Sequence, residues 1–382
     1  MSGIVLNCGY VPLVDCAPLV IAKELGFVSE HGLDLNLVRQ PSWSALRDML
    51  ALGHLEAAQM LSPMPVAMSI GLGGLPARVD SLMVLSVNGT VFGLSKALSA
   101  EIGPVTFGDA AGLLDLLAAR KGKVLRVGLP FHYSMHQLLL SYWASVAPDL
   151  AIEEITVPPP RMADAVADGF VDAFWVGEPW GSVAVQRDVG ELVMAGRDVW
   201  AYAPEKVLAA RHDWLSENPQ TARRLMRAVY QASAWLDVAR NRPLAIEILG
   251  RSEHLSMSPE LIDGALTGHL IPKKGSHPVE VSRFLQFHKH AASFPWRSQA
   301  AWIASHLGAD PAAVQKAKSC FRSDLYRQNL MDVGADMPGA SEKQEGALRY
   351  ETGEASSRGN MILAPDAFFD CRAFDFTQKD DE

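Results

Sequence analysis

The feature that most restricts the fold of this chain is a pattern that occurs twice, in two segments far apart in the sequence. Each copy is a helix-like stretch, a glycine and a strand-like stretch: residues 45–52, Gly53 and 54–58 in the first, and residues 162–168, Gly169 and 170–174 in the second. A glycine suits the left-handed conformation that often ends a helix. The repetition predicts two similar lobes with one copy in each. A common helix-to-strand turn that recurs by chance would give the same pattern.

The segments around these copies alternate in the same way. Residues 4–7 are a short apolar run, a helix start at Asp15 and Pro18 precedes residues 19–25, and residues 33–38 alternate apolar and polar side chains. Alternating strands and helices are typical of α/β proteins with largely parallel sheets. We therefore expect an α/β clam-shell with mixed, mostly parallel sheets.

The length of 382 residues suits two domains rather than one. Strand-like residues 82–87 and 91–94 would carry the chain out of the first lobe, and residues 192–202 would bring it back. The chain would then cross between the lobes twice. We expect the following division: residues 1–96 and 201–336 in lobe one, residues 97–200 in lobe two, and residues 337–382 in a C-terminal loop and tail.

The C-terminal part departs from the alternation. Residues 337–360 are rich in Gly, Ser and Glu and have little apolar periodicity, which predicts a loop or partial disorder. Residues 368–374 are aromatic again. We expect this aromatic segment to dock, either on the rest of the chain or on a partner.

Charge and cysteine usage exclude several classes of function. The formal net charge of −9 disfavours binding to nucleic acid or to an anionic membrane, so an anionic ligand would need a local positive pocket. The four cysteines have no CxxC spacing, which indicates reduced thiols rather than a zinc or redox site. The N-terminus lacks a leader pattern and no apolar run is long enough to span a bilayer, which predicts a cytoplasmic location.

No motif in the sequence indicates catalysis. His132 and His136 have the spacing of a metal pair on a helix, but the HExxH pattern and a third ligand are missing. The run Gly71-Leu72-Gly73-Gly74 ends a helix-like stretch instead of opening a helix, so we interpret it as a loop rather than a dinucleotide site. We expect no enzyme activity, no metal and no cofactor.

The positions left as candidates for a ligand lie where strands are expected to end, which is where open α/β sheets bind ligands. Trp43 lies at a strand-to-helix turn with Ser42 as its N-cap, and its indole could wall a pocket or simply pack. Thr90 follows Gly89 and offers a hydroxyl at the expected mouth of the cleft, although a plain turn explains it equally well.

Four further candidates follow the same logic. His136 opens a predicted helix after strand 124–129, where an imidazolium could face an anion. Gly177 and Glu178 follow a buried strand, and Glu178 could accept a hydrogen bond or be a solvated carboxylate. Lys206 stands in an apolar stretch just after the second crossover, where it could be a ligand or a solvated side chain.

Together these segments resemble the nitrate- and bicarbonate-binding family of periplasmic-type solute-binding proteins. The resemblance covers residues 1 to about 300 and rests on an ordered series of motifs: Gly9-Tyr10-Val11-Pro12-Leu13-Val14-Asp15 with Ala17-Pro18-Leu19, Ser42-Trp43, Gln59-Met60-Leu61-Ser62-Pro63-Met64-Pro65, Ser134-Met135-His136, Val176-Gly177-Glu178-Pro179-Trp180, and Glu205-Lys206-Val207-Leu208.

The resemblance implies a C-shaped, type II periplasmic-binding-protein-like fold with an oxyanion in the cleft. Carried over by position, the pocket would comprise Trp43, Thr90, His136, Gly177, Glu178 and Lys206. The family's nitrate binders have Lys at the position of Lys206, whereas its bicarbonate binders have an acidic residue and a calcium ion, so the resemblance favours nitrate or nitrite. Thr90 departs from the pattern, because nitrate transport proteins tend to have Gln there.

A cytoplasmic member of this kind resembles the nitrate/nitrite sensor of the nitrate-assimilation regulatory pair. The resemblance then implies a protein partner, an RNA-binding antiterminator response regulator that is released when nitrate binds. The alternative is a substrate-binding protein of a nitrate ABC transporter. A second alternative is an enzyme similar to the pyrimidine-precursor synthases of thiamin biosynthesis.

Overall fold

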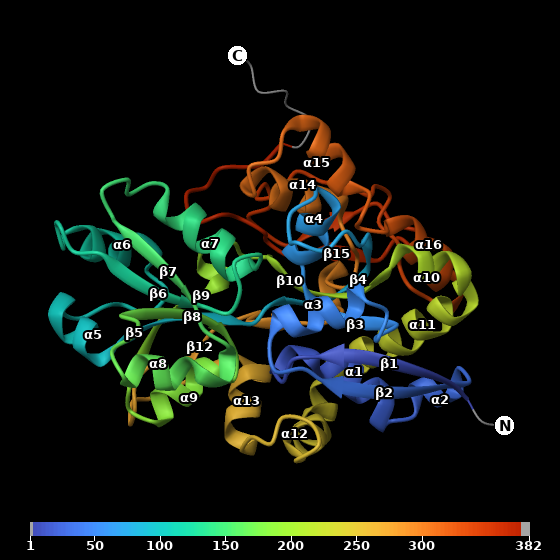
Figure 1. Cartoon of the computed structure of the whole chain (residues 1–382), viewed down its shortest axis with the longest axis horizontal. Helices are drawn as coiled ribbons and strands as arrows, with labels where there is room; N and C mark the ends of the chain where they lie inside the picture. Colours follow the sequence, from blue (N-terminus) through green and yellow to red (C-terminus); the bar gives the residue numbers. More distant parts are fainter. Residues whose placement is uncertain (1–2, 376–382) are drawn as a thin grey trace.

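The computed structural model describes residues 3–375 and has two β-sheets, each covered by helices (Figure 1). In the described chain the first sheet has the order β13-β4-β10-β3-β1-β2, with these bounds: β1 (Ile4–Tyr10), β2 (Leu33–Arg39), β3 (Ala57–Leu61), β4 (Val79–Asn88), β10 (Pro204–Arg211) and β13 (Leu285–Gln286). The second has the order β7-β6-β8-β5-β9, with these bounds: β5 (Thr90–Ser95), β6 (Leu125–Leu129), β7 (Ile152–Thr156), β8 (Ala173–Gly177) and β9 (Gly190–Ala195). The two sheets are the centres of two lobes.

The sheets are mixed, as expected, and most strands of each sheet run in one direction. Among the pairings of residues 3–375 in these two sheets, β1 with β2, β1 with β3, β6 with β7 and β6 with β8 are parallel. The other five are antiparallel: β3 with β10, β4 with β10, β4 with β13, β5 with β8, and β5 with β9. Most pairings are nevertheless antiparallel because β10 in the first sheet and β5 in the second run against the neighbours on both sides; the apolar pattern of a buried strand does not encode its direction.

The repeated helix, glycine and strand occur once in each lobe. In the first lobe α3 (Trp43–Ala51) leads through Gly53, whose φ is 81°, to β3. In the second α8 (Met162–Ala167) leads through Gly169, whose φ is 66°, to β8. β3 lies between β1 and β10, and β8 lies between β6 and β5, so each copy pairs with one parallel and one antiparallel neighbour. The prediction of one copy per lobe is confirmed.

The chain crosses between the sheets twice, as expected. It leaves the first sheet at Asn88, the end of β4, and enters the second at Thr90, the start of β5. It leaves the second sheet with β9 and returns through β10. β5 therefore belongs to the second sheet, ahead of the boundary expected after residue 96. Asn88 holds the first crossing, since its amide donates to the carbonyl of Ala201 at 3.0 Å.

Helices cover both sheets, and α3 and α7 carry Trp43 and His136 at their first turns. In the first lobe they are α1 (Ala17–Glu24), α2 (Phe27–Glu30), α3, α4 (Pro63–Ser69), α10 (His212–Glu217), α11 (Pro219–Leu236), α12 (Arg242–Gly250) and α13 (Pro259–Thr267). In the second they are α5 (Lys96–Ile102), α6 (Ala110–Ala118), α7 (Met135–Ala144), α8 and α9 (Trp180–Gln186). Within residues 3–375 no helix combines the length and the apolar character needed to cross a bilayer.

The C-terminal part consists of helices that pack on the first lobe and a folded segment beyond them. Its elements are α14 (Arg297–His306), α15 (Pro311–Lys318), α16 (Ser323–Leu330), β14 (Thr352–Glu354) and β15 (Met361–Leu363), and two short strands precede them, β11 (His269–Leu270) and β12 (Val279–Glu280). β14 and β15 pair with each other in the segment predicted to be a loop or partly disordered.

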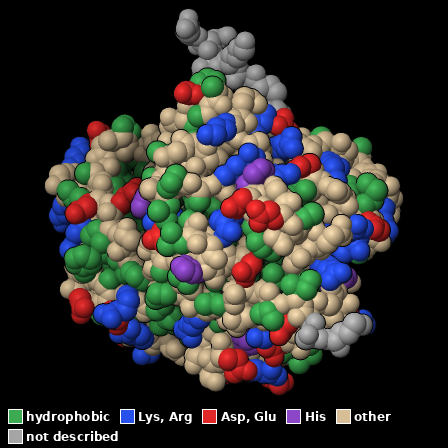
Figure 2. Space-filling model, turned by 45° about the vertical axis from the view of Figure 1, so that its right-hand side comes forward, with side chains coloured by type: hydrophobic (Ala, Val, Ile, Leu, Met, Phe, Trp, Pro, Cys, Tyr) green, Lys and Arg blue, Asp and Glu red, His purple; other side chains and the backbone are tan. Residues whose placement is uncertain are grey.

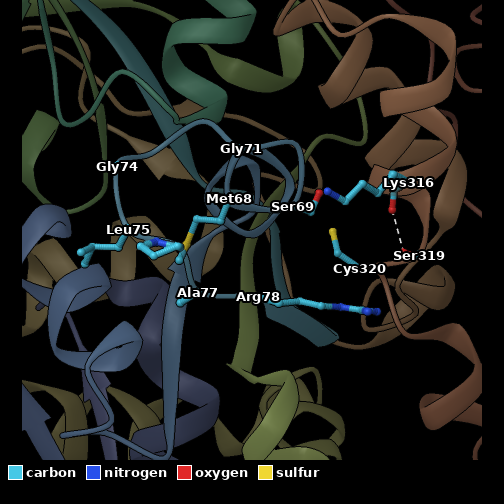
Figure 3. A pocket seen from close by; sticks show the side chains of 11 residues that line it. Met68, Ser69, Gly71, Gly74, Leu75, Ala77, Arg78, Lys316, Ser319 and Cys320 are labelled. Carbon is cyan, nitrogen blue, oxygen red and sulfur yellow. Dashed lines mark hydrogen bonds between the residues drawn. The ribbon is translucent and has the colours of Figure 1, made fainter.

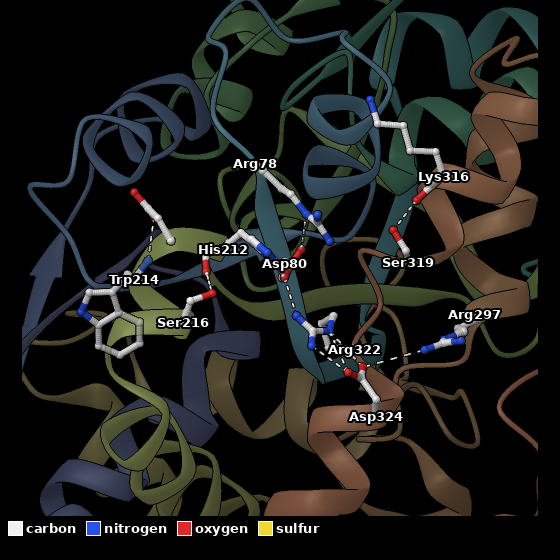
Figure 4. A network of polar contacts seen from close by, with 11 residues as sticks. Arg78, Asp80, His212, Trp214, Ser216, Arg297, Lys316, Ser319, Arg322 and Asp324 are labelled. Atoms are coloured by element: carbon white, nitrogen blue, oxygen red, sulfur yellow. Dashed lines mark hydrogen bonds and ion pairs between the residues drawn. The ribbon is translucent and has the colours of Figure 1, made fainter.

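A buried carboxylate ties the C-terminal helices to the first sheet (Figure 4). Asp80 in β4 has no exposed surface, and its Oδ2 lies 2.7 Å from His212 Nδ1 and 2.8 Å from Arg322 Nη1. Arg78 Nε lies 3.4 Å from Asp80 Oδ1. Because these partners come from three segments, the network fixes the start of α16 against the edge of β4.

The aromatic C-terminal segment docks on the rest of the chain, one of its two predicted destinations. The ring of Phe368 lies 4.9 Å from that of Trp200 and 5.1 Å from that of Tyr142, measured between centroids. The hydroxyl of Tyr142 in α7 donates to the carboxylate of Asp370 at 2.9 Å. The acidic end of the tail, residues 379–382, lies outside the described residues.

Candidate functional site

Lys206 is the centre of a buried polar cluster between the lobes. It lies in β10 with no exposed surface, and its Nζ is 2.8 Å from Asp15 Oδ2 and 2.7 Å from Glu205 Oε1. Both carboxylates are almost completely buried as well. A buried ammonium is stable only with such partners, so the solvated lysine left open by the sequence is excluded.

Asp15 is held in place by its own lobe. Gln59 in β3 donates from Nε2 to Asp15 Oδ1 at 2.5 Å, and its Oε1 accepts from the backbone N–H of Val11 at 3.1 Å. Asp15 lies in a short 3-10 turn ahead of α1, and the N-cap of that helix is Cys16, without a side-chain hydrogen bond. The carboxylate therefore serves the cluster rather than starting the helix as the sequence suggested.

Trp43 forms one wall of the cluster. Its ring centroid lies 5.3 Å from Lys206 Nζ, within the range of a cation–π contact. Ser42 caps α3, because its hydroxyl accepts from the N–H of Ala45 at 3.2 Å, which confirms the predicted N-cap. This cap fixes Trp43 at the first position of the helix and aims its indole at the ammonium.

His136 reaches the cluster from the second lobe. It stands in the first turn of α7, which Ser134 caps by accepting from the N–H of Gln137 at 3.2 Å. The side chain is 1% exposed, its Nδ1 lies 3.4 Å from Glu205 Oε1, and neither ring nitrogen has a hydrogen-bond partner. The unused nitrogens of this buried imidazole can receive a ligand or a proton, a property that His254, beside Glu24, shares.

Gly177 lets the second lobe approach the cluster closely. A Cβ at this position would lie 2.6 Å from the side chain of Leu13, 3.7 Å from Asp15 Oδ2 and 4.0 Å from His136 Nε2. The lobes touch here through the N–H of Val14, which donates to the carbonyl of Glu178 at 3.0 Å. A side chain at position 177 would require the side chain of Leu13 to move.

The remaining two candidates are engaged inside the second lobe. Glu178 accepts from the N–H and the hydroxyl of Ser182, both at 3.1 Å, at the start of α9. The hydroxyl of Thr90 accepts from the indole N–H of Trp175 at 3.0 Å. The structure thus brings Trp43, His136, Gly177 and Lys206 together, whereas a ligand role for Thr90 and Glu178 remains a prediction.

Burial dominates the electrostatics of the cluster. It raises the pKa of Asp15, and it raises the pKa of Glu205 to about 7 against the opposing pull of Lys206. Burial acts to lower the pKa of Lys206, but Asp15 and Glu205 more than reverse this, so the pKa lies above its ordinary value. Burial, with Lys206 adding to it, holds the pKa of His136 well below its ordinary range. The resting cluster is an ammonium, a neutral imidazole and two carboxyls.

The sequence reasoning missed three residues of this cluster: Asp15, Gln59 and Glu205. All three lie in the motifs that carry the family resemblance, and Glu205 is the neighbour of Lys206. A buried lysine needs counter-charges nearby, and this need could have pointed to these three residues. The sequence did not show that Lys206 is buried, so this need could be applied only after the structure was known.

The described residues offer no alternative metal site. Within residues 3–375 no group of three or more His, Cys, Asp and Glu side chains is arranged to hold a metal ion. His132 is more exposed than His136, and its ring lies 4.5 Å from that of Phe131 and 4.2 Å from that of Tyr133. His132 lies ahead of α7, which begins at Met135, so the two histidines are not one turn apart on a helix.

A surface cavity of about 380 Å³ lies apart from the cluster, between the end of α4 and α15 (Figure 3). Gly71 and Gly74 line it, and both have positive φ in a loop that follows α4, which confirms the interpretation of the glycine run as a loop. Lys316 and Arg78 also border the cavity.

On the face shown in Figure 2 basic and acidic side chains are interspersed rather than gathered by sign.

Comparison with known proteins places this fold among solute-binding proteins. Residues 5–250 match the NMT1-like family. The chain is 37% identical over 312 residues to the nitrate import ATP-binding protein NrtC of Synechocystis sp. PCC 6803, covering 80% of this chain and 46% of that protein. It is 38% identical over 262 residues to the bicarbonate transport ATP-binding protein CmpC of Synechococcus elongatus PCC 7942, covering 67% of this chain and 39% of that protein. The chain thus spans less than half the length of these two relatives.

A solved structure agrees with nearly the whole chain. The crystal structure of the periplasmic nitrate-binding protein NrtA from Synechocystis PCC 6803 superposes with a TM-score of 0.83 at 27% identity, covering 98% of this chain and 96% of that one. The agreement includes the C-terminal part, which lies beyond the residues that carry the family motifs.

Proposed function

Because this chain belongs to the NMT1-like family, and to the nitrate- and bicarbonate-binding proteins within it, we propose that it binds nitrate or nitrite in the cleft between its lobes. The observation that carries the proposal is the buried Lys206, which Trp43 covers from the first lobe and which His136 faces from the second. Binding then acts by closing the lobes, since the site is complete only when both contribute.

The chemistry of these residues suits a small, flat, monovalent oxyanion. Removing such an anion from water costs several kcal/mol unless a cation and hydrogen bonds replace its hydration. The net charge of −9 rules out a general attraction, so the ammonium of Lys206 has to supply it locally. The indole of Trp43 can stack on a planar ion, and the one N–H of the neutral His136 ring can donate to an oxygen of the ion.

Nitrate or nitrite is favoured over bicarbonate by the cation of the site. Lys206 occupies the centre of the cluster with a fixed ammonium. As the family resemblance implies, nitrate binders have a lysine at this position, whereas bicarbonate binders have an acidic residue there and a calcium ion. We expect anion binding in this cleft to need no metal cation.

The role that these considerations favour is that of a substrate-binding protein for nitrate uptake by an ABC transporter. It is supported by the relatives, which are named for nitrate import and bicarbonate transport. The sensor that controls an RNA-binding antiterminator in the cytoplasm is the second candidate, and it rests on the family resemblance alone. Both roles consist of ligand binding without catalysis. We propose no chemical reaction at this site, because Lys206 is paired with Asp15 and Glu205.

Titration calorimetry with nitrate, nitrite, bicarbonate and an alkanesulfonate tests the ligand. We expect nitrate or nitrite to bind with a dissociation constant of about 1 µM or tighter and bicarbonate to bind much more weakly. Equal affinity for all four anions, or none, would contradict the proposal.

A second experiment separates the two roles. Deletion of the chromosomal gene should abolish uptake of labelled nitrate at low concentration if the protein serves a transporter. If uptake is normal while nitrate no longer induces the assimilation genes, the sensor role is correct. Affinity capture of the full chain with and without nitrate would then show whether an RNA-binding partner is released.

A further inference from the structure

The cleft cluster, defined as Asp15, His136, Glu205 and Lys206, has no net positive charge to offer an anion. One ammonium lies within 2.8 Å of two carboxylates, and all of these groups are buried. If both carboxyls are ionised the cluster carries one negative charge before any ligand arrives. A monovalent anion would bring the total to two negative charges in a dry site, where repulsion is strong.

Something must therefore compensate the charge of the ligand. The nearby basic side chain Arg47 is occupied elsewhere, since its Nε pairs with Asp48 at 2.7 Å and its guanidinium lies 5.9 Å from the ring of Phe131. A proton from the solvent is the smallest cation that can follow an anion into a closed cleft. The cluster already contains the acceptors that such a proton needs.

The His136–Glu205 pair is the place for it. Nδ1 of His136 lies 3.4 Å from Glu205 Oε1, so a proton bound to either group can be shared between them across the lobes. Nε2 of the same ring is unpartnered and points toward Gly177. We propose that each nitrate or nitrite ion enters together with one proton, held by the His136–Glu205 pair; this inference rests on the proposed function.

The balance of the step is simple. The free cluster, the anion and one solvent proton combine, and the net charge of the protein with its ligand stays the same as that of the free protein. No bond other than that to the proton is formed or broken. Protonation turns Glu205 from a repelling carboxylate into a neutral acid, or His136 into an imidazolium that donates to the anion.

The groups around the His136–Glu205 pair favour a shared proton. His136 in α7 faces Glu205 and Lys206, which both lie in β10, and it lies near Asp15 across Gly177. Burial raises the pKa of Glu205 to about 7, and an added negative charge raises it further. Proton uptake therefore has to occur above about pH 7, where the free cluster has lost its proton and the occupied one has kept it.

Proton uptake fixes the direction in which the nitrate affinity changes with pH. Below about pH 7 the proton is already present in the free protein, so the affinity for nitrate should not change with pH. Above that value each pH unit should weaken binding up to about tenfold, until the pKa of the occupied site is reached. An anion site that relied on a free ammonium would instead show constant affinity over this range.

Calorimetry of the full chain with sodium nitrate in two buffers of different ionisation enthalpy measures the proton directly. We expect the number of protons taken up per nitrate to rise toward one between about pH 6 and about pH 8. Tight binding with zero uptake at every pH would overturn this inference and leave the proposed function intact. Absence of binding would overturn the proposed function itself.

Variants locate the proton. Glu205→Gln keeps the shape of the protonated acid, so it should bind nitrate with almost no proton uptake and with an affinity that no longer falls above about pH 7. Glu178→Gln tests the other carboxyl beside the cleft, whose pKa burial also raises to about 7. Loss of uptake in Glu178→Gln and its retention in Glu205→Gln would refute the assignment. Glu345→Gln makes the same chemical change in a buried lysine cluster outside the cleft and should leave uptake at the wild-type value.

Discussion

Two lysines of this protein have nearly the same surroundings and different consequences. Lys206 lies beside Asp15 and Glu205, with the ring of Trp43 at 5.3 Å. Lys343 lies beside Glu345 and Asp366, with the ring of Trp296 at 5.8 Å. Each group is one ammonium, two carboxylates and one indole in the interior. We call the second group, with Ser298, the C-terminal cluster.

The charged groups of the C-terminal cluster are all paired, although Trp296 Nε1 has no partner among the described residues. Ser298 donates to Glu345 Oε1 at 2.7 Å, and the N–H of Leu348 donates to Asp366 Oδ1 at 2.8 Å. Lys343 contacts the other oxygen of each carboxylate. Its carboxylates and its ammonium therefore have the partners they need, and the cluster can only hold the segment that contains it.

The cleft cluster is left partly unsatisfied. Neither ring nitrogen of His136 has a hydrogen-bond partner among the described residues, whereas Asp15 Oδ2 is paired with Lys206 at 2.8 Å. Unused donors and acceptors are expensive in the interior, and they are retained where a ligand completes them. The comparison shows that the pairing of the titratable groups, and not the kind of residues, distinguishes a structural cluster from one that can bind a ligand.

Breaking the C-terminal cluster should have the largest effect on stability. Replacing Lys343 by Met leaves Glu345 and Asp366 buried without a cation, which costs about 3–5 kcal/mol when one partner of a buried pair is removed. Urea denaturation measures the loss, and Lys316→Met on the exposed side of α15 is the matched control. Nitrate affinity should stay within about twofold of wild type. A loss below about 1 kcal/mol would show that the cluster does not hold the segment.

The same replacement in the cleft should act on the ligand. Lys206→Met removes the cation and should weaken nitrate binding by about 2–5 kcal/mol, the range for truncating one partner of a buried charged pair. Calorimetry measures this, and the double variant with Glu205→Gln separates the loss of attraction from the remaining repulsion. If Lys206→Met binds nitrate within about threefold of wild type, under ~1 kcal/mol, the pocket is assigned wrongly.

The pH dependence of stability sharpens the comparison without a ligand. The folded pKa of Glu205 is raised from 4.5 to about 7, so the folded state keeps a proton that the unfolded chain releases. The stability from this group is complete below the unfolded pKa and is lost as the pH rises through about 7. The wild type should lose about 3 kcal/mol relative to Glu205→Gln over that window. Denaturant unfolding at several pH values tests this, with exposed Glu30→Gln expected to follow the wild type.

The smallest effect concerns the contact between the C-terminal segment and the second lobe. Tyr142→Phe removes the hydrogen bond to Asp370 and keeps the ring against Phe368, so it should cost about 1 kcal/mol. Thermal unfolding measures the loss, and Asp370→Asn should reproduce it only in part. Hydrogen exchange should quicken in residues 364–375 and not in β10. Unchanged exchange in that segment would mean that the aromatic contacts alone hold it.

Local patterns predicted much of the fold and part of the site. Strand and helix periodicity, together with the glycines at positions 53 and 169, gave two lobes with one repeated unit in each. The cap at Ser42 and the helix after residue 134 were visible because caps act over three residues. Strand direction was not predictable, since a buried apolar strand has the same composition whether its neighbour runs parallel or antiparallel.

The sequence by itself determined which elements form, the two crossings of the chain, and that Trp43, His136, Gly177 and Lys206 stand at strand ends or helix starts. Only the tertiary structure decided that Asp15 lies 2.8 Å from Lys206, a residue far along the chain, and that the unpartnered ring of His136 meets Glu205 from the other lobe. Periodicity and capping are short-range properties, which a sequence displays directly. The charge balance of a buried site depends on contacts that exist only after both sheets have formed and closed on each other.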